Sequence, residues 1–170
     1  DGAVVTGGRD SCVKIWRLQD GIVEAPAAEI PTTSWVMSLC SFGEGVSERF
    51  PLGGFAIGCR NGDVLIVAAG DTAVGTVLRG HTAPVCSLSC SGGLLASGSW
   101  DEAMRLWSID DERCLQTRGG HENQVCCLLL PNGDVVTGST GIPFQDPVAP
   151  SVYGVIEHKL RVWRDGQMIT

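Results

Sequence analysis

The chain has 170 residues, a formal net charge of −7 and a pI near 4.8. This acidic balance argues against nucleic acid as a partner, because proteins that bind nucleic acid need a basic face. No apolar run approaches the roughly 20 residues that a membrane-spanning helix needs. No stretch has sustained helical periodicity, and the 23 glycines suit an all-β protein with many tight turns.

Short apolar or alternating runs bounded by Gly, Pro, Asn and Asp predict strands along the whole chain. In order, the predicted strands span Val4–Gly7, Val13–Trp16, Val36–Phe42, Gly54–Cys59, Val64–Ala68, Val74–Leu78, Val85–Cys90, Leu94–Ser99, Met104–Trp107, Val125–Leu130, Val135–Gly138 and Leu160–Trp163. Asn61-Gly62 predicts a tight hairpin with a type I′ turn, in which both central residues have positive φ.

An internal repeat organises these strands. Gly80-His81 and Gly120-His121 lie 40 residues apart, and Leu-Ala-Ser-Gly-Ser-Trp-Asp (95–101) and Met-Arg-Leu-Trp (104–107) lie between them. Ser97, Asp101 and Trp107 follow His81 by 16, 20 and 26 residues. The same positions are occupied by Thr6, Asp10 and Trp16 in an earlier unit, by Ile57, Asn61 and Val67 in a weaker one, and by Thr137 and Trp163 after His121.

The polar residues of the repeat are expected to be structural. His81, Ser97, Asp101 and Trp107 can form one buried chain of hydrogen bonds, which satisfies polar groups that would otherwise be costly to bury. His121, Thr137 and Trp163 predict a second chain, and Thr6, Asp10 and Trp16 a third. The unit with Ile57, Asn61 and Val67 lacks these groups and must rely on apolar packing.

The pattern resembles the WD40 repeat, which implies a β-propeller built of four-stranded blades. We expect an all-β propeller segment with about three such blades and partial blades at both ends, within a propeller of seven. The expected units are 1–18 (end of a blade), 22–69, 73–109, 113–163 with an insertion at 141–156, and 166–170 (start of the next). Because the chain begins within a repeat, we expect it to be a segment of a longer protein.

Within this class, residues 80–101 are similar to the third blade of the phospholipase A-2-activating protein family. The closing Leu-Arg-Val-Trp-Arg-Asp-Gly-Gln (160–167) also resembles that family, whereas the insertion and the long loop Gly43–Gly53 depart from it. The resemblance implies that the propeller binds ubiquitin. It also implies that the whole protein is an adaptor, joined to a AAA ATPase through domains outside this chain.

The four strands of a blade are labelled a to d from the central channel outward. Partner binding is expected on the face where, in each blade, the loop before strand a and the turn between strands b and c open together. Arg9, Arg60 and Trp100 precede the turn position in three units, and Trp35, Pro84 and Gln124 precede strand a; the insertion adds Phe144 and Tyr153. Trp and Arg dominate binding hot spots. The alternatives are that Trp100 lies flat on a neighbouring loop, and that the insertion is a floppy loop.

The eight cysteines lie mostly in apolar runs and are interpreted as free structural thiols, so neither metal nor cofactor is expected. Free thiols favour a reducing compartment, the cytoplasm or the nucleus. Two other functions are alternatives to the ubiquitin-binding adaptor. One is a generic WD40 scaffold or substrate receptor in a ubiquitin-ligase or signalling complex. The other, an enzyme, is disfavoured because no nucleophile elbow, phosphate loop or carboxylate pair is present.

Overall fold

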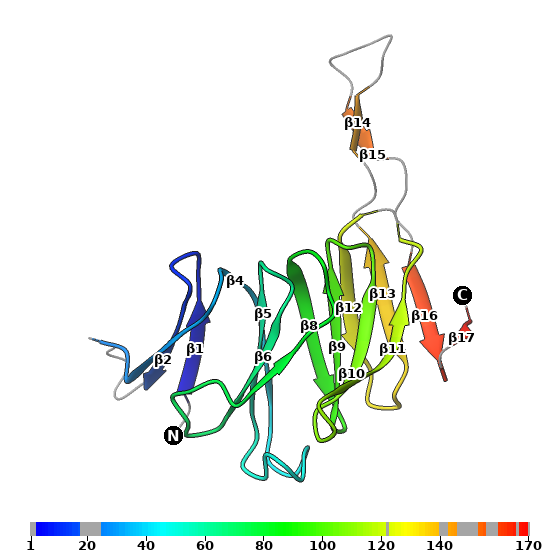
Figure 1. Ribbon diagram of the computed structural model, residues 1–170. Coiled ribbons are helices and arrows are strands. Elements are labelled where there is room, and N and C mark those ends of the chain that lie inside the picture. The colour runs from blue at the N-terminus through cyan, green and yellow to red at the C-terminus, as the bar shows by residue number, and fades with distance from the viewer. Residues whose placement is uncertain are drawn as a thin grey trace.

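The computed structural model describes residues 3–17, 25–121, 123–139, 143–145, 153–155, 160–165 and 167–169. Every regular element in these ranges is a β-strand, and the ranges contain no helix long and apolar enough to cross a membrane. The strands form antiparallel sheets that stand in a row, each beside the next (Figure 1). The fold is therefore all-β, as the sequence predicts.

One three-stranded and three four-stranded sheets follow one another along the chain. The first contains β1 (Ala3–Gly7), β2 (Cys12–Arg17) and β3 (Ala28–Pro31). The second contains β4 (Val36–Phe42), β5 (Gly54–Cys59), β6 (Val64–Ala68) and β7 (Thr76–Leu78). The third contains β8 (Val85–Ser91), β9 (Leu94–Ser99), β10 (Met104–Ser108) and β11 (Arg113–Arg118).

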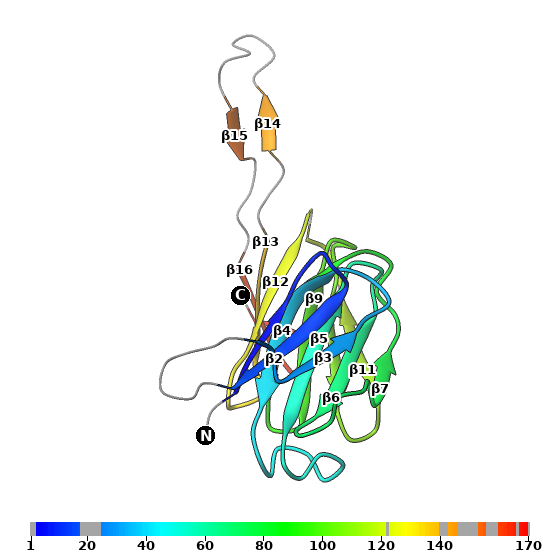
Figure 2. The same ribbon diagram turned by 90° about the vertical axis from the view of Figure 1, so that its left-hand side faces the viewer.

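The fourth sheet is interrupted by an insertion. It contains β12 (Val125–Leu129), β13 (Val135–Ser139), β16 (Leu160–Arg164) and β17 (Gln167–Met168). Between β13 and β16 the chain forms a small hairpin of β14 (Pro143–Gln145) and β15 (Tyr153–Val155), which projects beyond the end of the sheet (Figures 1 and 2). The hairpin replaces the turn between strands b and c, so it leaves the fourth sheet at the same end as those turns in the other sheets.

The structure differs from the predicted elements in three ways. Strands β3 and β11 were not predicted, because an outer strand packs on one side only; β11 alternates between exposed and half-buried residues. Strand β17 pairs with β16 and completes the fourth sheet, rather than starting another. The predicted units therefore begin one strand early, each with the outer strand of the preceding sheet.

The predicted type I′ turn at Asn61-Gly62 is wrong, although the hairpin is present. Only Gly62 has a positive φ, of 94°. The Gly62 N–H donates to Cys59 O at 3.3 Å, and the Cys59 N–H donates to Asp63 O at 2.9 Å. These bonds describe a type I turn followed by one left-handed residue. The Asn61 carboxamide oxygen accepts the Asp63 N–H at 3.2 Å, which stabilises a negative φ at Asn61.

The hydrophobic core lies between the sheets, in three clusters. Val13 and Ile30 of the first sheet pack with Ile57 and Val67 of the second. The second cluster joins Ile66 and Leu78 to Leu95 and Trp107, and the third joins Ala96 and Met104 to Leu129 and Val135. Burial of each such side chain contributes about 2 kcal/mol. Neighbouring sheets thus stabilise one another.

Close backbone contacts fix the spacing of the sheets. A Cβ at Gly58 would lie 2.7 Å from Val85 O, and a Cβ at Gly98 would lie 2.2 Å from Val125 O. Both glycines stand on the second strand of a sheet, against the start of the next sheet. Serine hydroxyls join the inner strands beside them: Ser38 Oγ donates to Val85 O at 2.8 Å, and Ser87 Oγ donates to Cys127 O at 3.2 Å.

The loop 43–53 extends from the opposite end of the second sheet and contacts the third (Figure 1). Ser47 Oγ donates to Asp110 Oδ1 at 2.5 Å, and Arg49 forms a 2.6 Å ion pair with Glu112. The Ser47 hydroxyl and then the Arg49 backbone N–H, which donates to Asp110 Oδ1 at 3.1 Å, hold the pKa of the Asp110 carboxyl below its usual value. The loop thus clamps two sheets together at the face away from the hairpin.

Candidate functional site

The third sheet holds a complete chain of polar side chains. Trp107 Nε1 donates to Ser97 Oγ at 2.8 Å, and Ser97 Oγ lies 2.7 Å from His81 Nε2. His81 Nδ1 lies 2.8 Å from Asp101 Oδ2. Asp101 also accepts the backbone N–H groups of Thr82 and Ala103, so it ties the loop before β8 to the turn after β9.

The order Ser97, His81, Asp101 is that of a hydrolytic triad, but its surroundings fit a structural role. Ser97 is fully buried, the His81 side chain is 0% exposed, and Trp107 occupies the far side of the hydroxyl. A substrate carbonyl has no route to Ser97 Oγ. The hydrogen bonds instead satisfy every polar group in this network of four side chains, which fixes one arrangement of the strands.

Burial lowers the pKa of His81, and this outweighs the hydrogen bond to the Asp101 carboxylate that would raise it. The folded state therefore keeps His81 neutral, whereas the unfolded chain takes up a proton near pH 6.5. Stability from this group is present above that pH and lost as the pH falls below it, because the unfolded state then binds more protons. We expect urea titrations at pH 7.5, 6.5 and 5.5 to show a decreasing free energy of unfolding.

The matched variant for this pH dependence is His81→Gln, which retains a polar side chain but cannot titrate. Its free energy of unfolding is expected to be lower at every pH and to change less between pH 7.5 and 5.5. Equal slopes for the two proteins would mean that His81 does not carry the effect.

Parts of this hydrogen-bonded side-chain network recur in the other sheets. Thr137 Oγ1 accepts from Trp163 Nε1 at 2.8 Å and lies 2.8 Å from His121 Nε2. In the second sheet, Ile57 and Val67 occupy the corresponding positions and are fully buried. That sheet therefore relies on apolar packing where the third and fourth use hydrogen bonds.

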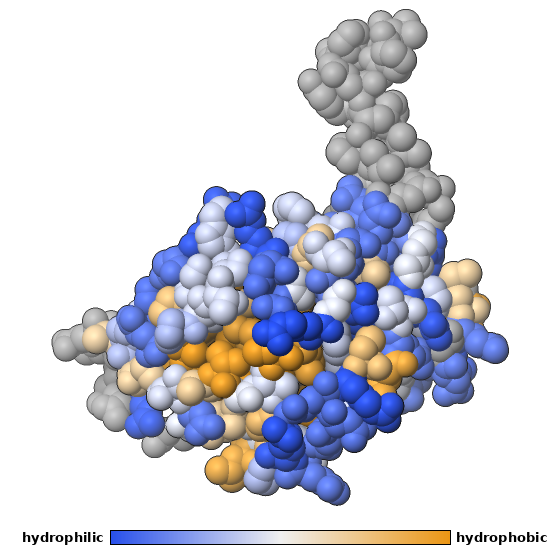
Figure 3. All heavy atoms as spheres, viewed as in Figure 1, coloured by the Kyte–Doolittle hydropathy of each residue, from blue (hydrophilic) through white to orange (hydrophobic). Residues whose placement is uncertain are grey.

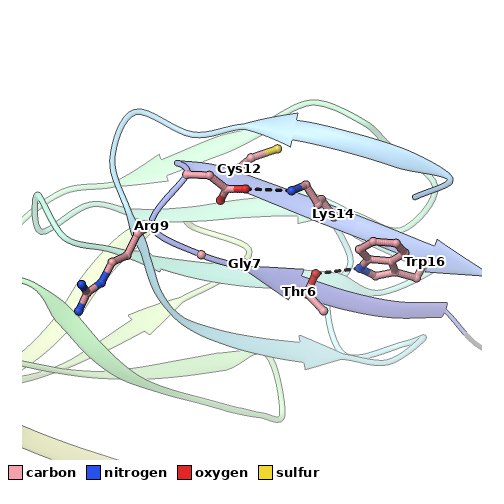
Figure 4. A pocket seen from close by; sticks show the side chains of 8 residues that line it. Thr6, Gly7, Arg9, Cys12, Lys14 and Trp16 are labelled. Carbon is pink, nitrogen blue, oxygen red and sulfur yellow. Dashed lines mark hydrogen bonds and ion pairs between the residues drawn. The ribbon is translucent and has the colours of Figure 1, made fainter. Parts of the chain in front are cut away.

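The predicted buried chain of Thr6, Asp10 and Trp16 is wrong in part, because the described residues of the first sheet retain only the Trp–hydroxyl bond, in an exposed setting, and Asp10 does not join it. Trp16 Nε1 donates to Thr6 Oγ1 at 2.8 Å, and Asp10 forms a 2.9 Å ion pair with Lys14 (Figure 4). These side chains line a hollow of about 390 Å³. Figure 4 shows Arg9 on the turn after β1, pointing away from the others.

Arg9 points to the second sheet, where it forms part of a cation–π cluster. Its guanidinium carbon lies 5.1 Å from the ring centroid of Trp35, and that of Arg60 lies 4.2 Å from the same ring. The Arg60 N–H donates to Trp35 O at 2.9 Å, which joins the turn after β5 to the start of β4. Three of the predicted loop-face residues are thus in one cluster, which we call the Arg–Trp–Arg cluster.

Trp100 occupies the same position in the third sheet and is 52% exposed. The backbone N–H of Trp100 donates to Pro84 O at 3.0 Å, and this bond is the counterpart of the backbone bond between Arg60 and Trp35. The two sheets meet at this end, because a Cβ at Gly62 would lie 2.4 Å from His81 O. The Arg–Trp–Arg cluster and Trp100 therefore lie at the same end of two adjacent sheets.

Gln124, Phe144 and Tyr153 are the remaining predicted loop-face residues. Gln124 is half-buried, and its N–H donates to Asn123 Oδ1 at 2.7 Å. Phe144 and Tyr153 have backbone positions in β14 and β15, but their side chains lie outside the described part. Glu157 stands six residues before Trp163, where the repeat spacing predicts the turn residue, and it is also outside the described part.

The eight cysteines are free thiols, and the described residues contain no group of three or more His, Cys, Asp or Glu side chains placed to hold a metal ion. Two of the cysteines, Cys40 on β4 and Cys90 on β8, interact across neighbouring inner strands. A hydrogen bond from the Cys90 thiol lowers the pKa of Cys40 to about 7. Burial raises the pKa of Cys86 and of Cys127 to about 12, so these two thiols stay protonated.

Sequence reasoning placed Arg9, Trp35 and Arg60 on one face but missed their stacking. An arginine stands just before the turn residue in two units, but this repeated position gives no sign that the two arginines meet at one ring. The groove on the outer side of the first two sheets was also missed. It measures about 340 Å³, is lined by Ile30, Leu65, Val74 and Val77 among others, and lies where Figure 3 shows apolar surface.

Comparisons with known proteins agree with this architecture. Residues 71–108 and 112–142 match the family model of the WD domain, G-beta repeat. WD repeat-containing protein 18 of Bos taurus is 43% identical over 61 residues, which cover 34% of this chain and 14% of that protein. Phospholipase A-2-activating protein of Xenopus laevis is 34% identical over 87 residues, which cover 50% of this chain and 11% of that protein.

A solved structure, that of U3-55K, superposes with a TM-score of 0.73 over 98% of this chain and 47% of the other, at 19% identity. At that identity the likeness concerns the fold alone. The chain spans no more than about a seventh of the two relatives named above. From the sheets, the repeated polar networks and these matches, we conclude that residues 71–108 and 112–142 are WD40 repeats and that the chain has the fold of a WD40 β-propeller segment.

Proposed function

We propose that this chain is a non-catalytic protein-interaction module whose loop face binds ubiquitin, within an adaptor for a AAA ATPase in ubiquitin-dependent protein degradation. The observation that carries the proposal is the exposed Trp100, held by its backbone bond to Pro84 at the same end of the sheets as the Arg–Trp–Arg cluster. An exposed aromatic side chain suits the small apolar patch of ubiquitin. The expected compartment is the cytoplasm or the nucleus, where the thiols of the chain stay reduced.

The choice of ubiquitin rests on similarity to phospholipase A-2-activating protein, since a WD40 fold alone does not specify a partner. WD repeat-containing protein 18 matches at a higher identity over a shorter stretch. That match favours the second candidate, a generic WD40 scaffold or a substrate receptor in a ubiquitin-ligase or signalling complex. Both candidates use the loop face and differ only in the partner.

A titration of isotope-labelled ubiquitin with this chain, followed by NMR, tests the proposal. We expect shifts confined to the apolar patch of ubiquitin, and Trp100→Ala is expected to weaken binding by about 30-fold, a loss of about 2 kcal/mol. Because the Trp100 side chain is exposed, the variant should fold normally.

Leu115→Ala is the matched control, since Leu115 is another exposed apolar side chain, 37% exposed on β11 and away from the loop face. Its affinity should equal that of the unchanged chain. If ubiquitin shifts persist with Trp100→Ala, the site lies elsewhere on the chain. If a folded sample at high concentration gives no shifts, ubiquitin is rejected and the second candidate stands.

A further inference from the structure

The Arg–Trp–Arg cluster holds two exposed positive charges close together. Trp35 is half-buried and fixed by its carbonyl bond to Arg60, so its ring is a firm platform for both guanidinium groups. Stacking on an aromatic face limits the freedom of an arginine side chain while leaving its N–H groups outward. Two like charges at one ring also repel each other, a cost that a bound anion would relieve.

Neither charge is neutralised within the described part of the chain. Arg9 and Arg60 form no ion pair there, and neither do Arg17, Arg105, Arg118 and Arg161, whereas Arg49, Arg79, Arg113 and Arg164 do. The carboxylates nearest in sequence are already engaged. Asp10 is paired with Lys14 at 2.9 Å, and Asp63 contacts Arg79 at 3.7 Å and Asn61 at 2.9 Å. What sets Arg9 and Arg60 apart is that both guanidinium groups lie at one ring.

We propose that the Arg–Trp–Arg cluster binds an acidic segment of a partner protein, with carboxylates of Asp or Glu side chains on Arg9 and Arg60. Each guanidinium presents a planar pair of N–H groups that fits one carboxylate. Two separate forks suit two carboxylates on one extended segment. The net charge of −7 repels acidic proteins at long range, but at 0.15 M salt that field fades beyond about 8 Å, so the local charges decide.

This inference rests on the proposed use of the loop face for partners, and it adds a second contact beside Trp100. An apolar contact at Trp100 and a charged contact at the cluster would together select a partner segment with an apolar residue next to acidic ones. Its test uses no ubiquitin, so its failure and that of the proposed function are separate results.

The test measures fluorescence anisotropy of a short labelled peptide of alternating Glu and Ser, titrated with the full chain at low and at physiological salt. Two matched peptides serve as further arms: one with Gln in place of Glu, and one with Gln and phosphoserine. The protein variants are Arg9→Gln with Arg60→Gln, Trp35→Leu, and Arg113→Gln as a control of equal charge change per site. Arg113 is exposed and already paired with Asp111.

We expect saturable binding of the Glu peptide that weakens with salt, and none of the Gln peptide. The double arginine variant should raise Kd about fivefold, the size expected for two exposed ion pairs. Trp35→Leu should also raise Kd, although it keeps both charges, because the platform is lost. Arg113→Gln should leave Kd unchanged.

Four results would overturn the proposal: no saturable binding of the Glu peptide, equal binding of the Gln peptide, an equal loss with Arg113→Gln, or an unchanged Kd in the double variant. Binding of the phosphoserine peptide without the Glu peptide would also overturn it, since it would assign the cluster to phosphate.

Discussion

Gly98→Ala is expected to lower the free energy of unfolding by about 3 kcal/mol and the melting temperature by roughly 10 °C, the upper range for overpacking in a chain of this size. A Cβ at this position would lie 2.2 Å from Val125 O, a backbone atom that cannot move without shifting β12. The third and fourth sheets would have to separate, and the cluster of Ala96, Met104 and Val135 between them would loosen. Thermal and guanidinium denaturation followed by tryptophan fluorescence measures the loss.

The repeat supplies a matched control for this substitution. Gly138 stands 40 residues after Gly98, in the same place on β13, and a Cβ there meets no atom within 4 Å among the described contacts. Gly138→Ala should therefore change stability by less than about 0.5 kcal/mol. Equal losses for the two substitutions would point to strand propensity rather than to the contact with Val125.

Ser97→Ala is expected to cost about 2–4 kcal/mol, because it leaves two buried groups without partners at once. Trp107 Nε1 loses its acceptor and His81 Nε2 loses the hydroxyl at 2.7 Å. Ser97→Thr should retain most of the stability, since Thr137 fills the corresponding position in the fourth sheet and makes both bonds. Chemical denaturation of the three proteins gives the comparison.

Thr6→Val tests whether burial is the reason for the large stability loss expected of Ser97→Ala. The bond between Trp16 and Thr6 has the same 2.8 Å length as that between Trp107 and Ser97, but Thr6 is exposed and water can replace it. Its loss should cost less than about 0.5 kcal/mol. A cost equal to that of Ser97→Ala would show that the hydrogen bond itself, and not the desolvation of its partners, carries the energy.

The repeated spacing made the third sheet predictable from sequence. A hydroxyl, a carboxylate and an indole at fixed intervals after His81 can meet only if the intervening strands pair in one register, and the structure has that register. The outer strands β3 and β11 were harder, because one face touches water and their sequences carry little pattern.

Contacts between sheets lay beyond the sequence. Stacking of Arg9 and Arg60 on Trp35 depends on the distance and angle between two sheets, which no local pattern encodes. The docking of Ser47 and Arg49 on Asp110 and Glu112 is similar, since the partners are more than 60 residues apart. The turn at Asn61-Gly62 was misassigned because Asn tolerates both signs of φ, and its side-chain bond to Asp63 selected the negative one.

The serine hydroxyls on β8 have a consequence for the exposed edge of the neighbouring sheet. Strand β12 ends its sheet and would offer unpaired N–H groups to any extended chain, the usual starting point for intermolecular β-pairing and aggregation. Ser87 Oγ accepts the Cys127 N–H at 3.0 Å, and Ser89 Oγ accepts the Leu129 N–H at 2.9 Å. Two side chains thus occupy the template that another strand would need, and the inner edge stays closed without an additional strand.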